Sequence, residues 1–202
     1  MVGFVPGKTT VEPNLATEWT TSDDGLMWEF KLREDVKFHD GTAFNADAVV
    51  YNAMRQLDPA HPEHTGTFEY WEYMYGGFLG DVNDEGNPTS VVKSVEAVDE
   101  YTVRFNMNRP LGPFIQDMGM FYMYQISPTA LKEQGENYGL PAYTPAGTGP
   151  FKFVEWVEGD HITLERYDEY HGEVAKINRV IIRIIPDNAA RYLALQAGDI
   201  HG

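Results

Sequence analysis

A strand, a tight turn and a capped helix follow one another early in this chain of 202 residues, and this segment constrains the fold more than any other. Over residues 28–33, apolar and charged side chains alternate with the period of two that is typical of a half-buried strand. Asp40-Gly41 is a strong turn signal, because glycine adopts positive φ without a Cβ clash. Asn45 can accept a backbone N–H hydrogen bond, and it therefore predicts a helix over residues 46–57.

Similar signals recur along the rest of the chain. They predict hairpins over 91–107 and 149–167, helices over 128–135 and 188–197, and a strand over 180–185. Continuous β-branched side chains in the last strand indicate that it is buried. Strands and helices in this irregular order favour an α+β or mixed α/β fold over a doubly wound sheet.

The overall charge argues against nucleic acid as a partner. Fifteen Lys and Arg face 31 Asp and Glu, which gives a net charge of −16, and no basic patch is visible. There is no cysteine, so disulfides and thiolate chemistry are excluded. The sequence also lacks the long apolar run of a membrane span and the basic and apolar regions of a leader peptide.

The segment Leu32 to Val49 reads Leu-Arg-x-x-Val-Lys-Phe-His-Asp-Gly-x-x-Phe-x-Ala-x-x-Val. It resembles the signature of the extracytoplasmic solute-binding proteins of peptide and nickel ABC importers (family 5). Three more segments resemble that family in the same order, at residues 15–25, 147–166 and 184–200. Departures such as Ala43, where proline is usual, fall at turns.

This resemblance implies a type II (cluster C) periplasmic-binding-protein-like fold made of two lobes. Residues 1–27 and 145–202 are then expected to form part of lobe I, with an inserted small α/β domain over 28–144. Members of the family are more than twice as long, so the second lobe is expected to be absent from this chain. Apolar surface and strand edges that the absent segments would cover should then promote self-association.

The resemblance also implies a function in binding rather than catalysis. The expected ligands are di- or oligopeptides or another small solute, delivered to the transmembrane subunits of an ABC permease, with no cofactor. The expected location is periplasmic, or extracellular and membrane-associated. An oligosaccharide is the alternative ligand, because aromatic residues are abundant. An aromatic-lined hydrolase using Asp40 or Asp81 is the alternative from another class.

The first candidate site is the segment 117–125, which in relatives precedes a Ser/Ala-Pro helix and faces the cleft. Its adaptable methionines and its aromatic rings suit a permissive pocket. The residues predicted to bind ligand here are Met120, Phe121, Tyr122 and Tyr124. Ordinary core packing explains the same pattern. The resemblance implies that nickel-chelate binders carry an arginine in this segment that contacts a ligand carboxylate, and its absence here argues against an anionic chelate as ligand.

Two further candidates have alternatives of their own. Trp71 lies in an aromatic run and could anchor a ligand, although its helical spacing with Tyr75 fits a buried face equally well. Gly147, Thr148 and Gly149 could let a peptide approach the backbone closely, although loop geometry explains these glycines too.

No metal site is predicted. His61 and His64 enclose Pro62 and Glu63 but lack the spacing of established zinc motifs. His39 beside Asp40 resembles part of a catalytic triad, but a structural hydrogen bond within the turn is the simpler interpretation.

Overall fold

The computed structural model describes all residues, 1–202, which divide into two compact units. The first comprises residues 1–138 and 146–148, and the second comprises 139–145 and 149–202. The expected boundary between residues 27 and 28 is not a division between these units, because the strands on either side of the preceding turn pair with each other. The assignment of either unit to a lobe stays a prediction.

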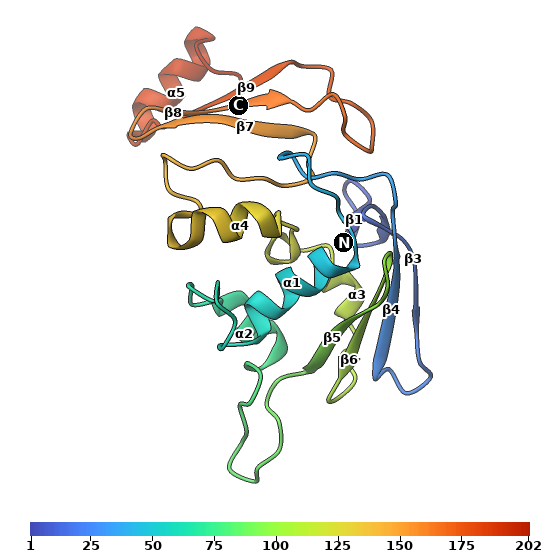
Figure 1. Ribbon diagram of the computed structural model, residues 1–202. Coiled ribbons are helices and arrows are strands. Elements are labelled where there is room, and N and C mark those ends of the chain that lie inside the picture. The colour runs from blue at the N-terminus through green and yellow to red at the C-terminus, as the bar shows by residue number, and fades with distance from the viewer. The chain divides into compact units, whose positions relative to one another are not determined.

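The first unit is built on a four-stranded antiparallel sheet in the order β3-β4-β6-β5 (Figure 1). Its strands are β3 (Ala16–Thr21), β4 (Met27–Leu32), β5 (Val92–Asp99) and β6 (Thr102–Met107). A short hairpin of β1 (Val2–Phe4) and β2 (Val11–Pro13) precedes it. Phe30 of β4 lies opposite Val103 of β6, and both side chains are buried. The predicted strand and the first predicted hairpin are thereby confirmed.

Helix α1 (Ala46–Leu57) begins where the sequence predicts. The Asn45 side chain accepts a hydrogen bond from the Ala48 N–H at 3.0 Å, and this satisfies one of the free donors of the first turn. Val49 and Ala53 are buried on the side of α1 that packs against β5. The Asn45 cap fixes where α1 begins, and the buried face of α1 packs on the sheet.

Short helices complete the first unit. They are α2 (Glu69–Tyr75), α3 (Phe114–Asp117), η1 (Phe121–Met123), α4 (Pro128–Gln134) and η2 (Gly135–Asn137). Ser127 caps α4 by accepting from the Ala130 N–H at 3.2 Å, as predicted. None of the helices has both the length and the apolar character needed to cross a membrane.

A buried amide joins α1 to the segment before α4. The Asn52 side chain is 4% exposed, and its Nδ2 donates to the carbonyls of Ala48 and Ile126, both at 2.8 Å. Its Oδ1 accepts from the Ile126 N–H at 3.2 Å. Asn52 therefore satisfies both backbone groups of Ile126, which has no strand partner, and it ties this residue to α1.

The second unit is an antiparallel sheet in the order β7-β8-β9 with one helix. Its elements are β7 (Phe151–Val157), β8 (His161–Arg166), β9 (Arg179–Arg183) and α5 (Asn188–Ala197). Asp187 caps α5 by accepting from the Ala190 N–H at 2.7 Å, and Gly198 ends it with a φ of 81°. The second predicted hairpin and the last helix are confirmed.

The expectation that residues 180–185 are buried is wrong for this chain. Residues 180–183 do lie in β9, but Ile181 and Ile182 are exposed, and so is Ile184 just beyond the strand, because side chains on the faces of this sheet are left uncovered. Helix α5 is exposed too, with Tyr192 and Leu193 among its solvent-facing side chains. The second unit therefore presents a sizeable apolar surface, which is the feature behind the expected self-association.

Replacing Asn52 by Ala should destabilise the first unit by about 2–3 kcal/mol, because both backbone groups of Ile126 lose their partner inside the protein. Urea unfolding measures the loss. Asn137→Ala is the control, since that side chain is exposed in η2, and it should change stability by less than about 0.5 kcal/mol. An equal effect of the two variants would contradict the structural role of Asn52.

Leu193→Glu should reduce self-association of the chain, because it places a charge on the apolar surface of α5, where Leu193 is 60% exposed. Sedimentation velocity over a concentration series measures the change. Gln196→Glu adds the same charge at an exposed polar position of α5 and should leave association nearly unchanged. A wild-type chain that stays monomeric throughout the series would refute the expectation.

Candidate functional site

Helix α2 presents one face to the core and the other to solvent. Trp71 and Tyr75 lie one turn apart and are both fully buried, with ring centroids 4.6 Å apart. The helix begins after Phe68, which has a left-handed φ of 47°, and it ends at Gly76 with a φ of 80°. With the phase set by the two buried rings, Glu69, Tyr70, Glu72 and Tyr73 face outward.

Gly76 is required where it stands. Its φ favours glycine, and a Cβ there would meet the Thr89 carbonyl oxygen at 2.8 Å and the Arg109 Nη2 at 2.9 Å. The Arg109 guanidinium is held at this place by donating to the Thr89 carbonyl at 2.6 Å. The Val91 N–H donates to the Tyr75 carbonyl at 2.6 Å, and this bond joins the carboxyl end of α2 to the segment just before β5.

The η1 segment is positioned by α1. The Gln56 side chain donates to the Tyr122 carbonyl at 3.0 Å, while Asn52 holds Ile126 as described above. Met123 points into the core and is 2% exposed. Because Met123 anchors the turn, its neighbours Phe121 and Tyr124 are left on the surface.

Tyr70 of α2 meets the η1 segment. Its ring lies edge-on to Phe121, with centroids 4.6 Å apart and planes at 83°, and parallel to Tyr122, with centroids 6.2 Å apart. Tyr70 is 56% exposed and Phe121 is 48% exposed. We call these three residues, together with Tyr73, the aromatic surface. It joins two segments that are about fifty residues apart in the sequence.

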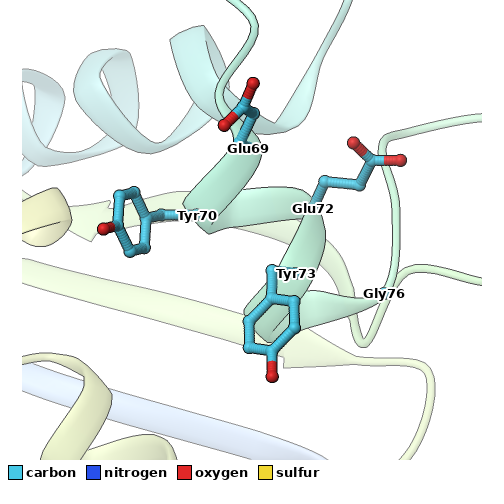
Figure 2. Close-up of a pocket in the computed structure, with 5 residues that line it drawn as sticks. All are labelled: Glu69, Tyr70, Glu72, Tyr73 and Gly76. Atoms are coloured by element: carbon cyan, nitrogen blue, oxygen red, sulfur yellow. The ribbon is translucent and has the colours of Figure 1, made fainter.

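A pocket of about 590 Å³ lies on the outer face of α2. It is lined by Glu69, Tyr70, Glu72, Tyr73 and Gly76, and we call it the α2 pocket. Figure 2 shows that the two carboxylates project from one side of the helix and that the tyrosine rings project from the other sides. Tyr70 and Tyr73 belong to both features, so the aromatic surface continues into the α2 pocket.

A buried carboxyl lies close to the aromatic surface. Asp117 is 4% exposed, and its Oδ2 has no hydrogen-bond partner. Burial raises the pKa of Asp117 to about 6, since removal from water disfavours the charged form. Burial also raises the pKa of Tyr122 to about 12, and the nearby Asp117 charge acts in the same direction. A titratable group thus stands beside a residue of the candidate site.

The structure distributes the predicted residues of the first candidate as follows. Phe121, Tyr124 and Met120 are exposed, and Tyr122 is partly buried. These four residues therefore lie where a ligand could reach at least part of each side chain. Their role in ligand binding stays a prediction.

Trp71 is placed differently from the expectation. It is fully buried against Tyr75, which agrees with the alternative of a buried helical face. Helical phase is the signal that distinguishes the residues of this run: if Trp71 and Tyr75 face inward, then Tyr70 and Tyr73 must face outward. The acidic neighbours Glu69 and Glu72 were not singled out by the sequence.

The third candidate is tied to the turn around Asp40. The His39 N–H donates to the Gly147 carbonyl at 2.8 Å, and the Gly147 N–H approaches the His39 Nδ1 at 3.4 Å. Thr148 belongs to the first unit with Gly147, while Gly149 belongs to the second. The backbone contact supports the explanation from loop geometry, and ligand contact by these three residues stays a prediction.

The histidines of the loop after α1 take part in local packing. The His61 ring lies edge-on to Tyr51 at 4.7 Å, and the His64 Nδ1 lies 2.8 Å from the Arg55 carbonyl. No three His, Asp or Glu side chains come together in an arrangement that could hold a metal ion.

Comparison with known proteins gives a consistent result. The sequence model for "Bacterial extracellular solute-binding proteins, family 5 Middle" matches residues 10–202. Heme-binding protein A of Haemophilus influenzae is 36% identical over 98% of this chain and 36% of its own length. The dipeptide-binding protein of Escherichia coli is 33% identical over 98% of this chain and 37% of its own.

A solved structure agrees with these relatives. The periplasmic binding protein DppA of Helicobacter pylori, in complex with the peptide STSA, superimposes with a TM-score of 0.82 at 35% identity. The match covers 98% of this chain and 39% of that one. The expected fold class is thereby confirmed, and the chain spans well under half the length of the proteins it matches.

Asp117→Asn should remove a pH dependence of stability. A carboxyl whose pKa is raised on folding stabilises the folded state when protonated, so this contribution is present at low pH and is lost as pH rises through about 6. At about pH 7.5 the variant should be more stable than wild type by about 1–3 kcal/mol, and at about pH 3.5, below the ordinary pKa of an aspartate, the two should be nearly equal.

Thermal unfolding at both pH values measures this difference. Asp84→Asn, an exposed loop substitution that also removes one carboxylate, should give the same small effect at both. A variant of Asp117 that is less stable than wild type at the higher pH would show that the carboxylate has a compensating partner.

Proposed function

Because this chain belongs to the family 5 bacterial extracellular solute-binding proteins, we propose that it forms part of the component that recognises peptides for an ABC importer. The single observation that carries this proposal is the aromatic surface, where Tyr70, Phe121 and Tyr122 form one partly exposed cluster. The dipeptide-binding relative and the peptide-bound structural neighbour support a peptide as the solute.

The aromatic surface suits side chains of varied shape. Aromatic rings offer large apolar faces at low cost in conformational entropy, and Tyr hydroxyls add polar contacts. Exposed Met120 lies beside Phe121 in the chain, and its flexible thioether adapts to different partners. Such a surface selects for the presence of apolar or amphipathic groups rather than for one side chain.

Recognition proceeds without catalysis in this proposal. The two acids that a hydrolase would most plausibly use both close turns. Asp40 accepts hydrogen bonds from the Thr42 N–H and hydroxyl, and Asp81 accepts from the Phe78 N–H at 2.8 Å. Burial opposes ionisation of Asp40, but hydrogen bonds from Ser127 and Thr42 outweigh it and lower the pKa of that carboxyl. A carboxylate that stays ionised and is already hydrogen-bonded within a turn serves to hold that turn rather than to transfer protons.

We propose that the solute is enclosed between this chain and an opposing part that corresponds to the remaining length of the relatives, of which the chain spans 36–37%. Closure excludes water from the solute, and the closed protein then docks on the membrane permease. The proposed location is extracytoplasmic, in keeping with the family description.

An oligosaccharide is the second candidate. It is favoured by the exposure of the Tyr70 and Phe121 rings, since flat aromatic faces also stack on sugar rings. Peptides and oligosaccharides could both stack on these rings, so a direct comparison of the binding of the two ligand classes is needed to distinguish them.

The test is a titration of the chain with small peptides and, separately, with oligosaccharides, followed by chemical shifts of the Tyr70 and Phe121 rings. Peptides should shift both resonances, and the affinity should be weaker than micromolar because only part of the enclosing surface is present. Phe121→Ala should weaken peptide binding by about fivefold, which corresponds to about 1 kcal/mol for one aromatic contact.

Tyr192→Ala is the matched control, because Tyr192 is an exposed tyrosine in the second unit, and it should leave the affinity unchanged. Shifts with oligosaccharides alone would favour the second candidate. Micromolar peptide affinity of this chain would refute the need for an opposing part, and hydrolysis of the added peptides, detected by mass spectrometry, would refute recognition without catalysis.

A further inference from the structure

Three polar groups from three separate elements meet behind the aromatic surface. Asp117 is the last residue of α3, Tyr75 is the last residue of α2, and Tyr122 lies in η1. The Asp117 Oδ2 has no hydrogen-bond partner, and the hydroxyl oxygens of both tyrosines are buried. Burial, with a contribution from the Asp117 charge, raises the pKa of each tyrosine, so the three groups are close enough to interact.

No charged group compensates the Asp117 carboxyl. Burial is the only cause of its raised pKa, which stands at about 6. The acids of α2, Glu69 and Glu72, are exposed. The amino group of Met1 donates to the Met118 carbonyl at 3.2 Å, but burial lowers its pKa to about 5, so it is uncharged near neutral pH. An ionised Asp117 is therefore a buried charge without a positive partner.

A solute on the aromatic surface would remove water from this same region. The partly buried ring of Tyr122 stacks parallel to the exposed ring of Tyr70, with centroids 6.2 Å apart. A neutral solute that covers these rings replaces water near the carboxyl by less polar groups. Because a less polar environment disfavours the charged form of an acid, such a solute should raise the pKa of Asp117 further.

We propose that Asp117 makes solute binding depend on pH: a neutral solute binds more tightly to the form of the protein in which Asp117 is protonated, so that binding takes up protons near neutral pH. The reason is reciprocal linkage, since a ligand that favours the protonated form must itself bind that form more tightly. The inference rests on the proposed function and deepens it by adding a regulation of the aromatic surface.

The sign of the pH dependence reports on what lies near the carboxyl. Affinity for a neutral solute should be highest when Asp117 is protonated and should fall as pH rises past about 6. A solute ammonium group beside the carboxylate would instead favour the charged form, and affinity would rise with pH. Asp117 is only 4% exposed, so a solute acts on it through the covering rings rather than by direct contact.

The test follows the carboxyl itself. Carbon NMR of the Asp117 side chain gives its pKa in the free chain and with near-saturating N-acetyl-phenylalanine amide, a neutral probe that does not titrate in this range. The probe should raise the pKa of Asp117. Its dissociation constant, measured from ring shifts of Tyr70 and Phe121, should increase by about threefold between about pH 5.5 and about pH 7.5.

A matched pair of variants assigns the effect to this carboxyl. Asp117→Asn is nearly isosteric and is never charged, so the probe should bind it with the same dissociation constant at both pH values. The control is Asp84→Asn, which removes an exposed acid of the loop after α2 and should keep the pH dependence of wild type. The histidines are present in both variants, so any contribution from them is shared.

The outcomes separate this inference from the proposed function. If the probe leaves the pKa of Asp117 unchanged or lowers it, or if Asp117→Asn keeps the pH dependence of wild type, the inference is overturned while recognition by the aromatic surface stands. If neither the probe nor small peptides shift the Tyr70 and Phe121 rings at any pH, the proposed use of the aromatic surface fails and the inference fails with it. A raised pKa, with the pH dependence lost only in Asp117→Asn, supports the inference.

Discussion

The candidate site depends on the hydrogen bonds of one buried side chain, that of Asn52. Its amide donates to the carbonyls of Ala48 and Ile126 and accepts from the Ile126 N–H. The segment after α3 is neither a strand nor a long helix, so its backbone groups need partners from elsewhere. Asn52 supplies them from α1, and Gln56 adds a contact to Tyr122 one turn later. The sheet positions α1, and α1 in turn positions η1.

The second determinant is the phase of α2. Burial of Trp71 and Tyr75 sets the rotation of this helix, and the same rotation puts two tyrosines and two glutamates in water. Phe114 of α3 packs against Tyr75, with ring centroids 6.1 Å apart, so the aromatic core and the aromatic surface are two sides of one arrangement. Apolar burial here serves to orient the exposed groups as well as to stabilise the fold.

Several elements could be predicted because their signals are local. Asn45, Ser127 and Asp187 each accept the backbone hydrogen bond expected of a helix cap. The hairpin of β5 and β6 falls within the predicted residues 91–107. These features depend on a few neighbouring residues, so they could be inferred without knowledge of the rest of the chain. Whether β9 is buried or exposed could not be inferred in this way, because β-branched residues favour strands whether or not another element covers them.

The candidate site shows the same distinction. The sequence alone determined that residues 117–125 and the run around Trp71 are rich in rings and that the chain carries an excess of acids, since composition and spacing are properties of the sequence. Only the tertiary structure decided that Tyr70, rather than Trp71, meets Phe121 and that Glu69 and Glu72 stay unpaired beside Tyr73. Which ring of an aromatic run faces the core depends on the surface it packs against, and that surface comes from distant parts of the chain.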